Sequence, residues 1–400
     1  MTTPRISSNE SSRQVTADIR RQQTAIAEAR EQLSSGKRIN RPSDDPAHAA
    51  RLVDMAAADR RLDQYERNAD AAESRLTLEE SALARVNDTL ARVRELTLSA
   101  GGGKNASDRA IIAGEIGGRL AELYDAGNAR DAAGDYLFAG SRADTRPFER
   151  GEPVEFRGNA VGRELSIGGS RTVASGDSGV DAFLRVPTGN GRFATDVDAG
   201  NTGSATIATG SVTDGAAFRN VDYRIEFTSA TSFDVVDVAS GTAVLAAQPF
   251  TDGEPITFEG ITTSIDGTPA VGDSFHVRSG ERRDVFATVA RLERLLLEPG
   301  DTPADRARLE QGIGNALDDL DRAVDGINAA RGRAGTRLQI VESSREENEG
   351  ISLQLARTRA DIEDVDVAEA VTELENHAFA LEVLQKSWAR VQNLSLFNYL

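Results

Sequence analysis

Two stretches decide the fold of this chain: residues 15–33, VTADIRRQQTAIAEAREQL, and residues 367–391, VAEAVTELENHAFALEVLQKSWARV. In each, apolar residues recur at the spacing of a helix with one apolar face. The chain ends in a further apolar run, LSLFNYL (394–400), where a terminal segment is normally polar. An apolar face on a terminal helix needs a partner, which the other terminal stretch and other copies of the chain can supply. We therefore predict an assembly interface made by Val15, Ile19, Ile26, Leu33, Val367, Val371, Leu374, Ala378, Leu381, Trp388, Val391, Leu394, Leu396, Phe397 and Leu400.

The composition favours long amphipathic helices over a thick globular core. Hydrophobic residues make up 39% of the 400 residues, aromatic residues 5% and charged residues 28%. A chain of this length predicts two or three domains. The formal net charge of −18 argues against nucleic-acid and anionic-membrane partners, which need a basic surface.

Several classes of site and segment are excluded by what the sequence lacks. Without cysteine, disulfides and cysteine-ligated zinc are impossible. No run of about 18 apolar residues is present, so we expect no membrane span. Residues 1–10 are polar and do not resemble a cleaved secretory signal, so export would need another route.

Heptad repeats predict long helices between the two terminal stretches. Asp45 followed by Pro46 indicates a capped helix start, and that helix runs to about Ala100. Glu79 is the one interruption of its second apolar seam, which is formed by Ala58, Tyr65, Ala72, Val86 and Val93. We expect shorter helices over about 107–133 and from about 282, then a long heptad helix over 313–341. A weaker piece with Ile351 and Leu355 leads to the C-terminal helix. The first seam is formed by Met55, Leu62, Ala69, Leu76, Leu83 and Leu90, which are seven residues apart.

The region 136–280 has the period of two that indicates β-strands. Apolar and polar residues alternate over 221–227, and 233–238, 256–265 and 275–277 are further strand candidates. Turns rich in glycine, asparagine and aspartate separate them, as in an antiparallel β domain. The glycine-rich stretch 198–210 has few large apolar residues and is predicted to be a loop.

No catalytic or metal-binding constellation is present in the sequence. Walker, dinucleotide-binding, zincin and nucleophile-elbow motifs are missing, so we predict no enzyme, no cofactor and no metal. Asp44 and Asp45 are interpreted as a turn and a helix cap because Pro46 follows directly. Asp196, Asp198 and Gly200 lack the closing acidic residue of a calcium loop. The three histidines, scattered along the chain, are His48, His276 and His377.

Five segments together resemble the flagellin superfamily and, within it, the proteins of the hook–filament junction. The proline-flanked form of the first segment and the C-terminal tail favour the junction proteins over filament flagellin. The segments are LSSGKRINRPSDDP (33–46), YLFAG (136–140), RPF (146–148), AGTRL (334–338) and DIEDVDVAEAVTE (361–373).

The resemblance implies an extracellular structural protein of the bacterial flagellum, exported unfolded through the flagellar type III channel without a cleaved signal peptide. It would form a ring of copies of itself between the other hook-associated junction protein and flagellin. An export chaperone would hold the C-terminal helix before export. Two alternatives are filament flagellin itself and a secreted adhesin-like module that binds through its β domain.

The predicted fold class is mainly α with an inserted β domain. Both terminal arms would form a long antiparallel helical bundle or coiled coil, with the β-rich domain between them. We predict three domains: a terminal coiled coil of residues 1–40 with 363–400, a helical bundle of 41–148 with 281–362, and an antiparallel β domain of 149–280.

Overall fold

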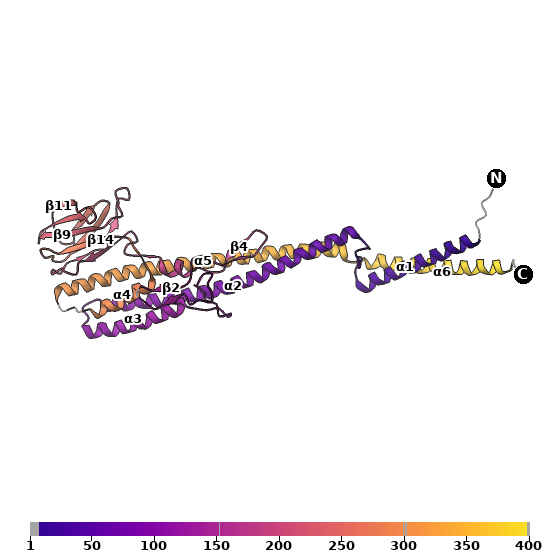
Figure 1. The fold of residues 1–400 in the computed structure, drawn as a ribbon, viewed down its shortest axis with the longest axis horizontal. Coiled ribbons are helices and arrows are strands. Elements are labelled where there is room, and N and C mark those ends of the chain that lie inside the picture. Colours follow the sequence, from indigo (N-terminus) through magenta and orange to yellow (C-terminus); the bar gives the residue numbers. More distant parts are fainter. Residues whose placement is uncertain (1–7, 152, 299, 301, 398–400) are drawn as a thin grey trace. The chain divides into compact units, whose positions relative to one another are not determined.

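The computed structural model describes residues 8–151, 153–298, 300 and 302–397. It confirms the predicted fold class, because helices open and close the chain around a β region (Figure 1). The chain falls into two compact units, residues 1–67 with 345–400 and residues 68–344. The three-domain division stays a prediction. The helices are α1 (Ser8–Ser35), α2 (Pro46–Ala100), α3 (Ala106–Gly127), α4 (Val285–Leu297), α5 (Pro303–Glu363) and α6 (Val367–Phe397), with one helical turn, η1 (Val180–Leu184).

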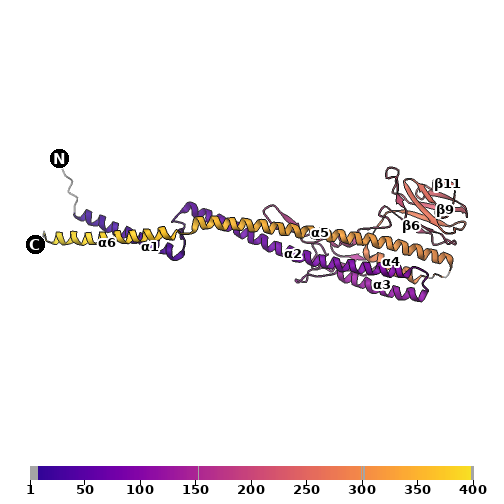
Figure 2. The ribbon, with the colours of Figure 1, turned by 180° about the vertical axis from the view of Figure 1, so that it is seen from behind.

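In the second unit, the heptad seams of α2 and α5 form the core. Leu83, Val86 and Leu90 of α2 are fully buried, as are Leu320 and Ile327 of α5 in the same cluster. Figures 1 and 2 view the chain from opposite sides, and both show these two helices side by side. The heptad repeats therefore specified the packing as well as the helices. The weaker piece expected around residues 351–355 is part of α5, which continues without a break to Glu363.

The third helix ends earlier than the predicted limit at residue 133. Its last residue is Gly127, and the Asn128 side chain then donates hydrogen bonds to the carbonyls of Tyr124 (2.8 Å) and Phe148 (3.0 Å). A Cβ at Gly127 would lie 3.1 Å from the rings of both Phe148 and Phe286. The close approach of these rings requires a glycine here. They belong to a buried aromatic cluster made by Tyr124, Phe138, Phe148, Phe183 and Phe286.

The β region is antiparallel, as predicted. One sheet has the order β11-β10-β9-β14-β6, and another has the order β12-β13-β7 with β8 also pairing with β13. The predicted alternation over 221–227 appears in β9, where Tyr223, Ile225 and Phe227 are buried. The strands of the two sheets are β6 (Phe193–Val197), β7 (Thr206–Ile207), β8 (Ser211–Val212), β9 (Tyr223–Ser229), β10 (Ser232–Asp237), β11 (Ala243–Pro249), β12 (Pro255–Phe258), β13 (Ile261–Asp266) and β14 (Ser274–Ser279).

Three short antiparallel ribbons lie outside these two sheets. They pair β1 with β2, β3 with β4, and β5 with β15. Their bounds are β1 (Phe148–Glu149), β2 (Glu155–Phe156), β3 (Glu164–Ser166), β4 (Thr172–Ala174), β5 (Val186–Pro187) and β15 (Arg282–Arg283).

Two expectations for the β region were wrong in detail. The strand expected over 256–265 is two strands, because the chain turns at Gly260, whose φ is +77°. The loop expected over 198–210 contains β7, and Ala205 and Ile207 belong to the buried cluster of the β region. Pairing with β13 and a hydrogen bond from the Ile207 amide to Gln311 Oε1 (2.8 Å) hold this short strand. None of the helices in the described part of the chain has the length and apolarity that crossing a bilayer requires.

Candidate functional site

The terminal helices α1 and α6 pack along each other in the first unit (Figure 2). Ile26 is 9% exposed and is the most deeply buried of the predicted interface residues whose side chains the structure describes. Halfway along the pair, His377 Nδ1 lies 2.7 Å from Gln22 Oε1. The half-buried members of the predicted interface are Val15, Ile19, Leu33, Leu374, Leu381 and Trp388.

A second set of apolar side chains on α6 is exposed. Of the predicted interface residues, Val367 is 60% exposed and Val371 is 39% exposed. The sequence prediction omitted Phe379, at 68%, and Val383, at 45%. We call Val367, Val371, Phe379 and Val383 the outer stripe. The signal for it was present in the sequence, because these residues follow a spacing of four that Glu375 interrupts.

A groove of about 620 Å³ lies between the two terminal helices. Ile26 and Ala27 of α1 and Ala378 and Leu381 of α6 give it an apolar lining. Its polar lining residues are Gln23, Arg30, Glu382 and Gln385. The exposed Ala378, also predicted for the interface, thus lies at this groove.

The remaining predicted interface residues lie at the C-terminal end of the chain. Val391, Leu394, Leu396 and Phe397 have a helical backbone, and their side chains lie outside the described part of the structure. Leu400 lies outside the described residues altogether.

The segments that follow α1 and precede α6 are joined by backbone hydrogen bonds. The Arg38 amide donates to the carbonyl of Glu363 (2.6 Å), and the Val365 amide donates to the carbonyl of Gly36 (3.1 Å). Lys37 Nζ adds an ion pair with Glu363 Oε1 at 2.5 Å. Two of the segments that carry the family resemblance, 33–46 and 361–373, therefore meet in space.

The paired carboxylates at the start of α2 serve the backbone. Asp44 Oδ2 accepts hydrogen bonds from the amides of Arg41 (2.8 Å) and Asn40 (3.1 Å), and these bonds lower the pKa of Asp44. Asp45 Oδ1 accepts from the His48 amide (3.1 Å), which lowers the pKa of Asp45. This geometry is that of a turn and a helix N-cap.

The other candidate polar residues also have structural partners. His276 Nε2 lies 3.1 Å from Asp198 Oδ2, which accounts for one histidine and one residue of the weak calcium motif. Asp198 Oδ1 accepts from the Gly200 amide (2.8 Å), as in an ordinary turn. Within the described ranges, no group of three or more histidine, cysteine, aspartate or glutamate residues is placed to hold a metal ion.

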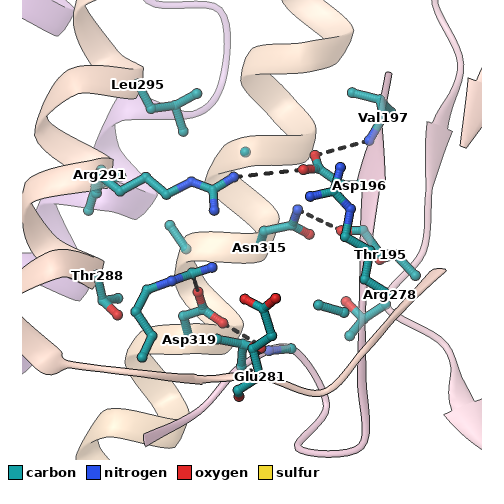
Figure 3. Close-up of a pocket in the computed structure, with 18 of the residues that line it drawn as sticks. Thr195, Asp196, Val197, Arg278, Glu281, Thr288, Arg291, Leu295, Asn315 and Asp319 are labelled. Atoms are coloured by element: carbon teal, nitrogen blue, oxygen red, sulfur yellow. Dashed lines mark hydrogen bonds and ion pairs between the residues drawn. The ribbon is translucent and has the colours of Figure 1, made fainter. Parts of the chain in front are cut away.

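A cavity of about 610 Å³ lies between the β region and helices α4 and α5 (Figure 3). Arg291 points toward Asp196 with an ion-pair distance of 3.7 Å, and Asn315 Nδ2 donates to the carbonyl of Thr195 (2.8 Å). Asp319 pairs with Arg283 at 2.6 Å and accepts from the Gly189 amide (2.8 Å). These ion pairs and hydrogen bonds hold the β region against the helices, so the polar residues that line the cavity have a structural role.

Two protein-family models match parts of the chain. Residues 6–143 match the bacterial flagellin N-terminal helical region. Residues 197–279 match the D2-like domain of flagellar hook-associated protein 1. The second match covers most of the two larger β sheets.

Similar proteins come from the flagella of several bacteria. Flagellar hook-associated protein 3 of Escherichia coli (strain K12) is 33% identical over 154 residues, which is 38% of this chain and 48% of that protein. The match therefore spans about half the length of that relative. Flagellin of the same strain is 40% identical over 107 residues, which is 26% of this chain and 22% of that protein.

Solved structures extend the likeness over most of the chain. The crystal structure of FlgL from Xanthomonas campestris has a TM-score of 0.72 at 28% identity, covering 77% of this chain and 99% of that one. The crystal structure of hook-associated protein 3 from Legionella pneumophila has a TM-score of 0.75 at 29% identity, covering 78% and 98%. Residues 6–143 thus match the flagellin N-terminal helical region, and over most of its length the chain is similar to hook-associated protein 3, FlgL.

Proposed function

We propose that this chain is a structural component of the bacterial flagellum that joins the hook to the flagellin filament at the hook–filament junction. It acts by assembling with other subunits and not as an enzyme. The observation that carries this proposal is the outer stripe of α6, which remains exposed although α6 is already paired with α1. Support comes from the likeness to junction proteins over more than three quarters of the chain.

Two paired helices can cover only the faces that they turn toward each other. Leu374, Leu381 and Trp388 are half-buried, whereas Phe379 is 68% exposed. Phe379 and Val383 lie one turn apart on α6, and burying such exposed apolar side chains against a neighbour releases free energy. Neighbouring copies of the chain would cover the outer stripe and fill the groove between α1 and α6. The fifteen predicted interface residues belong to this proposal.

The partners follow from a place at the junction. Copies of the chain form a ring that contacts the other hook-associated junction protein on one side and flagellin on the other. Before export through the flagellar type III channel, a chaperone covers the C-terminal helix. The chain then functions outside the cell as part of the flagellum.

Filament flagellin is the second candidate, because flagellin is 40% identical over part of the chain. The match of residues 197–279 to a hook-associated domain favours the junction. The two functions differ in self-assembly: a flagellin polymerises into long tubes, whereas a junction protein stops at a ring. Long tubes formed by the purified protein alone would favour the flagellin function.

A truncated protein tests the proposal. Removing residues 381–400 takes away part of α6 and leaves the second unit, residues 68–344, intact. We expect the truncated protein to keep the unfolding transition of the second unit and to lose ring formation on hooks. Filament growth in cells that carry only the truncated protein would refute the terminal interface.

A further inference from the structure

Glu79 is a buried carboxylate in the middle of the α2 seam. Its exposure is 1%, although the flanking seam residues are apolar. Glu79 Oε1 accepts a hydrogen bond from the Asp177 amide (2.8 Å). Glu79 Oε2 is buried and has no hydrogen-bond partner among the described residues. A buried carboxylate oxygen without a partner is costly when the group is ionised.

The neighbouring guanidinium groups make their hydrogen bonds elsewhere. Asp177, which is 7% exposed, forms ion pairs of 2.6 Å with both Arg333 and Arg337 of α5. Arg75, one turn before Glu79 on α2, donates to Asp131 Oδ2 (3.0 Å) and to the carbonyl of Tyr136 (2.8 Å). Among the described residues, Glu79 therefore lies beside another carboxylate and has no direct hydrogen bond to a cation.

The charged groups around Glu79 come from every element packed there. Helix α2 contributes Arg75, helix α5 contributes Arg333 and Arg337, and the 175–178 segment contributes Asp177. Three more charged groups act on Arg75: Asp131 and Asp135 from the 131–135 segment, and Arg163, the residue before β3. Arg163 Nη2 also pairs with Asp135 at 2.7 Å.

Burial, together with the negative charge of Asp177, raises the pKa of Glu79 to about 7. The hydrogen bond from the Asp177 amide and the charges of Arg337 and Arg75 oppose this rise. The carboxyl therefore changes its charge near neutral pH, in a place where only one of its two oxygens accepts a hydrogen bond from the described residues.

We propose that Glu79 is a proton-sensitive latch, which holds the segment 175–178 against α2 when its carboxyl is protonated and loosens that segment when the proton is lost. The backbone approaches closely here, because a Cβ at Gly176 would lie 2.9 Å from Glu79 Oε2. Next along the chain, the Gly179 amide donates to the carbonyl of Phe138 (2.8 Å), and Phe183 enters the aromatic cluster. Loosening at Glu79 thus acts on the chain that leads into the core.

Hydrogen exchange of the full-length protein at pH 6 and pH 8 tests the latch. For a carboxyl that titrates near 7 when closed and near 4.5 when open, the opening equilibrium of the segment rises about tenfold between these pH values. We expect this rise in a peptide covering 172–183, after the pH dependence of intrinsic exchange is divided out. A peptide covering 86–96 of α2 should not show it.

Two variants separate the latch from a general effect of pH. Glu79→Gln removes the titration and should abolish the tenfold rise. The matched control is Glu80→Gln, which removes a half-buried carboxylate paired with Arg331 at 2.6 Å and should leave the rise unchanged. A rise that persists in Glu79→Gln would overturn the proposal. If this variant does not fold, the unmodified protein decides: a tenfold rise confined to 172–183 supports the latch, and its absence refutes it.

Discussion

Replacing Phe379 by serine tests how much the outer stripe contributes to assembly. In the isolated chain this side chain is 68% exposed, so the substitution removes little buried contact. The folded monomer should therefore keep its helix content and its unfolding temperature. The substitution should weaken only the association of copies with one another.

The size of the loss follows from the exposed area. A phenylalanine side chain buries roughly 150–250 Å², so the exposed fraction leaves roughly 140 Å² in water. At about 25 cal/mol per Å², full coverage by a neighbour contributes about 3.5 kcal/mol, and half coverage about 1.8 kcal/mol. The variant should then associate between about 20-fold and about 300-fold more weakly per contact.

Sedimentation velocity over a range of protein concentrations measures this difference. The matched control is Glu373→Ser, an exposed polar position on the same helix that carries no apolar area. Phe379→Leu, which keeps the site apolar, should recover most of the association. If Phe379→Ser and the unmodified protein associate at the same concentration, the outer stripe is not an interface.

Four further predictions concern the folded chain. Hydrogen exchange on the monomer should be faster over 13–33 and 370–390 than over 82–96, because the terminal seam is only half-buried. Gly36→Ala should lower the free energy of unfolding by about 1–2 kcal/mol, because the φ of Gly36 is +71°, and thermal unfolding measures this loss. The control Gly350→Ala, at an exposed position inside α5 with open space around it, should raise the free energy of unfolding by about 0.5–1 kcal/mol. Leu90→Ala, at a fully buried site, should cost about 2–5 kcal/mol in denaturant unfolding. The pKa of Glu79 is raised from 4.5 to about 7 in the folded protein, so the stability due to its protonated form is complete below pH 4.5 and is lost as the pH rises through 7. Chemical unfolding should show this as a loss of up to about 3 kcal/mol by pH 8, which Glu79→Gln should not show.

The sequence predicted the helical arms well because their structure is local and repetitive. In α2, a methionine, leucine or alanine at every seventh position places one apolar face toward α5, and Pro46 fixes the helix start. The same kind of periodicity identified β9. Each of these signals is contained within the element that it predicts.

Local sequence patterns did not predict the features that depend on residues far away in the chain. The strand β7 exists because β13 and Gln311 supply its partners from elsewhere in the chain, while its own sequence has few large apolar residues. Glu79 looked like a defect in a heptad seam. The structure gives it the amide of Asp177, which is 98 residues away.

The sequence predicted the residues of the candidate site only in part, for a geometric reason. On a helix with 3.6 residues per turn, positions three apart differ by about 60° around the axis. The sequence prediction nevertheless placed Val371 with Leu374 in one seam. The structure separates them: Leu374 is half-buried with the α1–α6 pair, whereas Val371 belongs to the outer stripe.

The contrast in burial between the two units argues that assembly and ordering of the terminal helices are linked. In the second unit, Leu83, Val86 and Leu90 are fully buried, so that core is complete within one chain. In the first unit, Leu374, Leu381 and Trp388 stay half-buried and Phe379 is largely in water, so the α1–α6 pair gains much less from its own contacts. The neighbouring copies that we propose would bind the paired form and not the separated helices, and so would stabilise the pairing by mass action. On this proposal the core of the second unit is complete within one chain, whereas α1 and α6 reach full burial only in contact with other subunits.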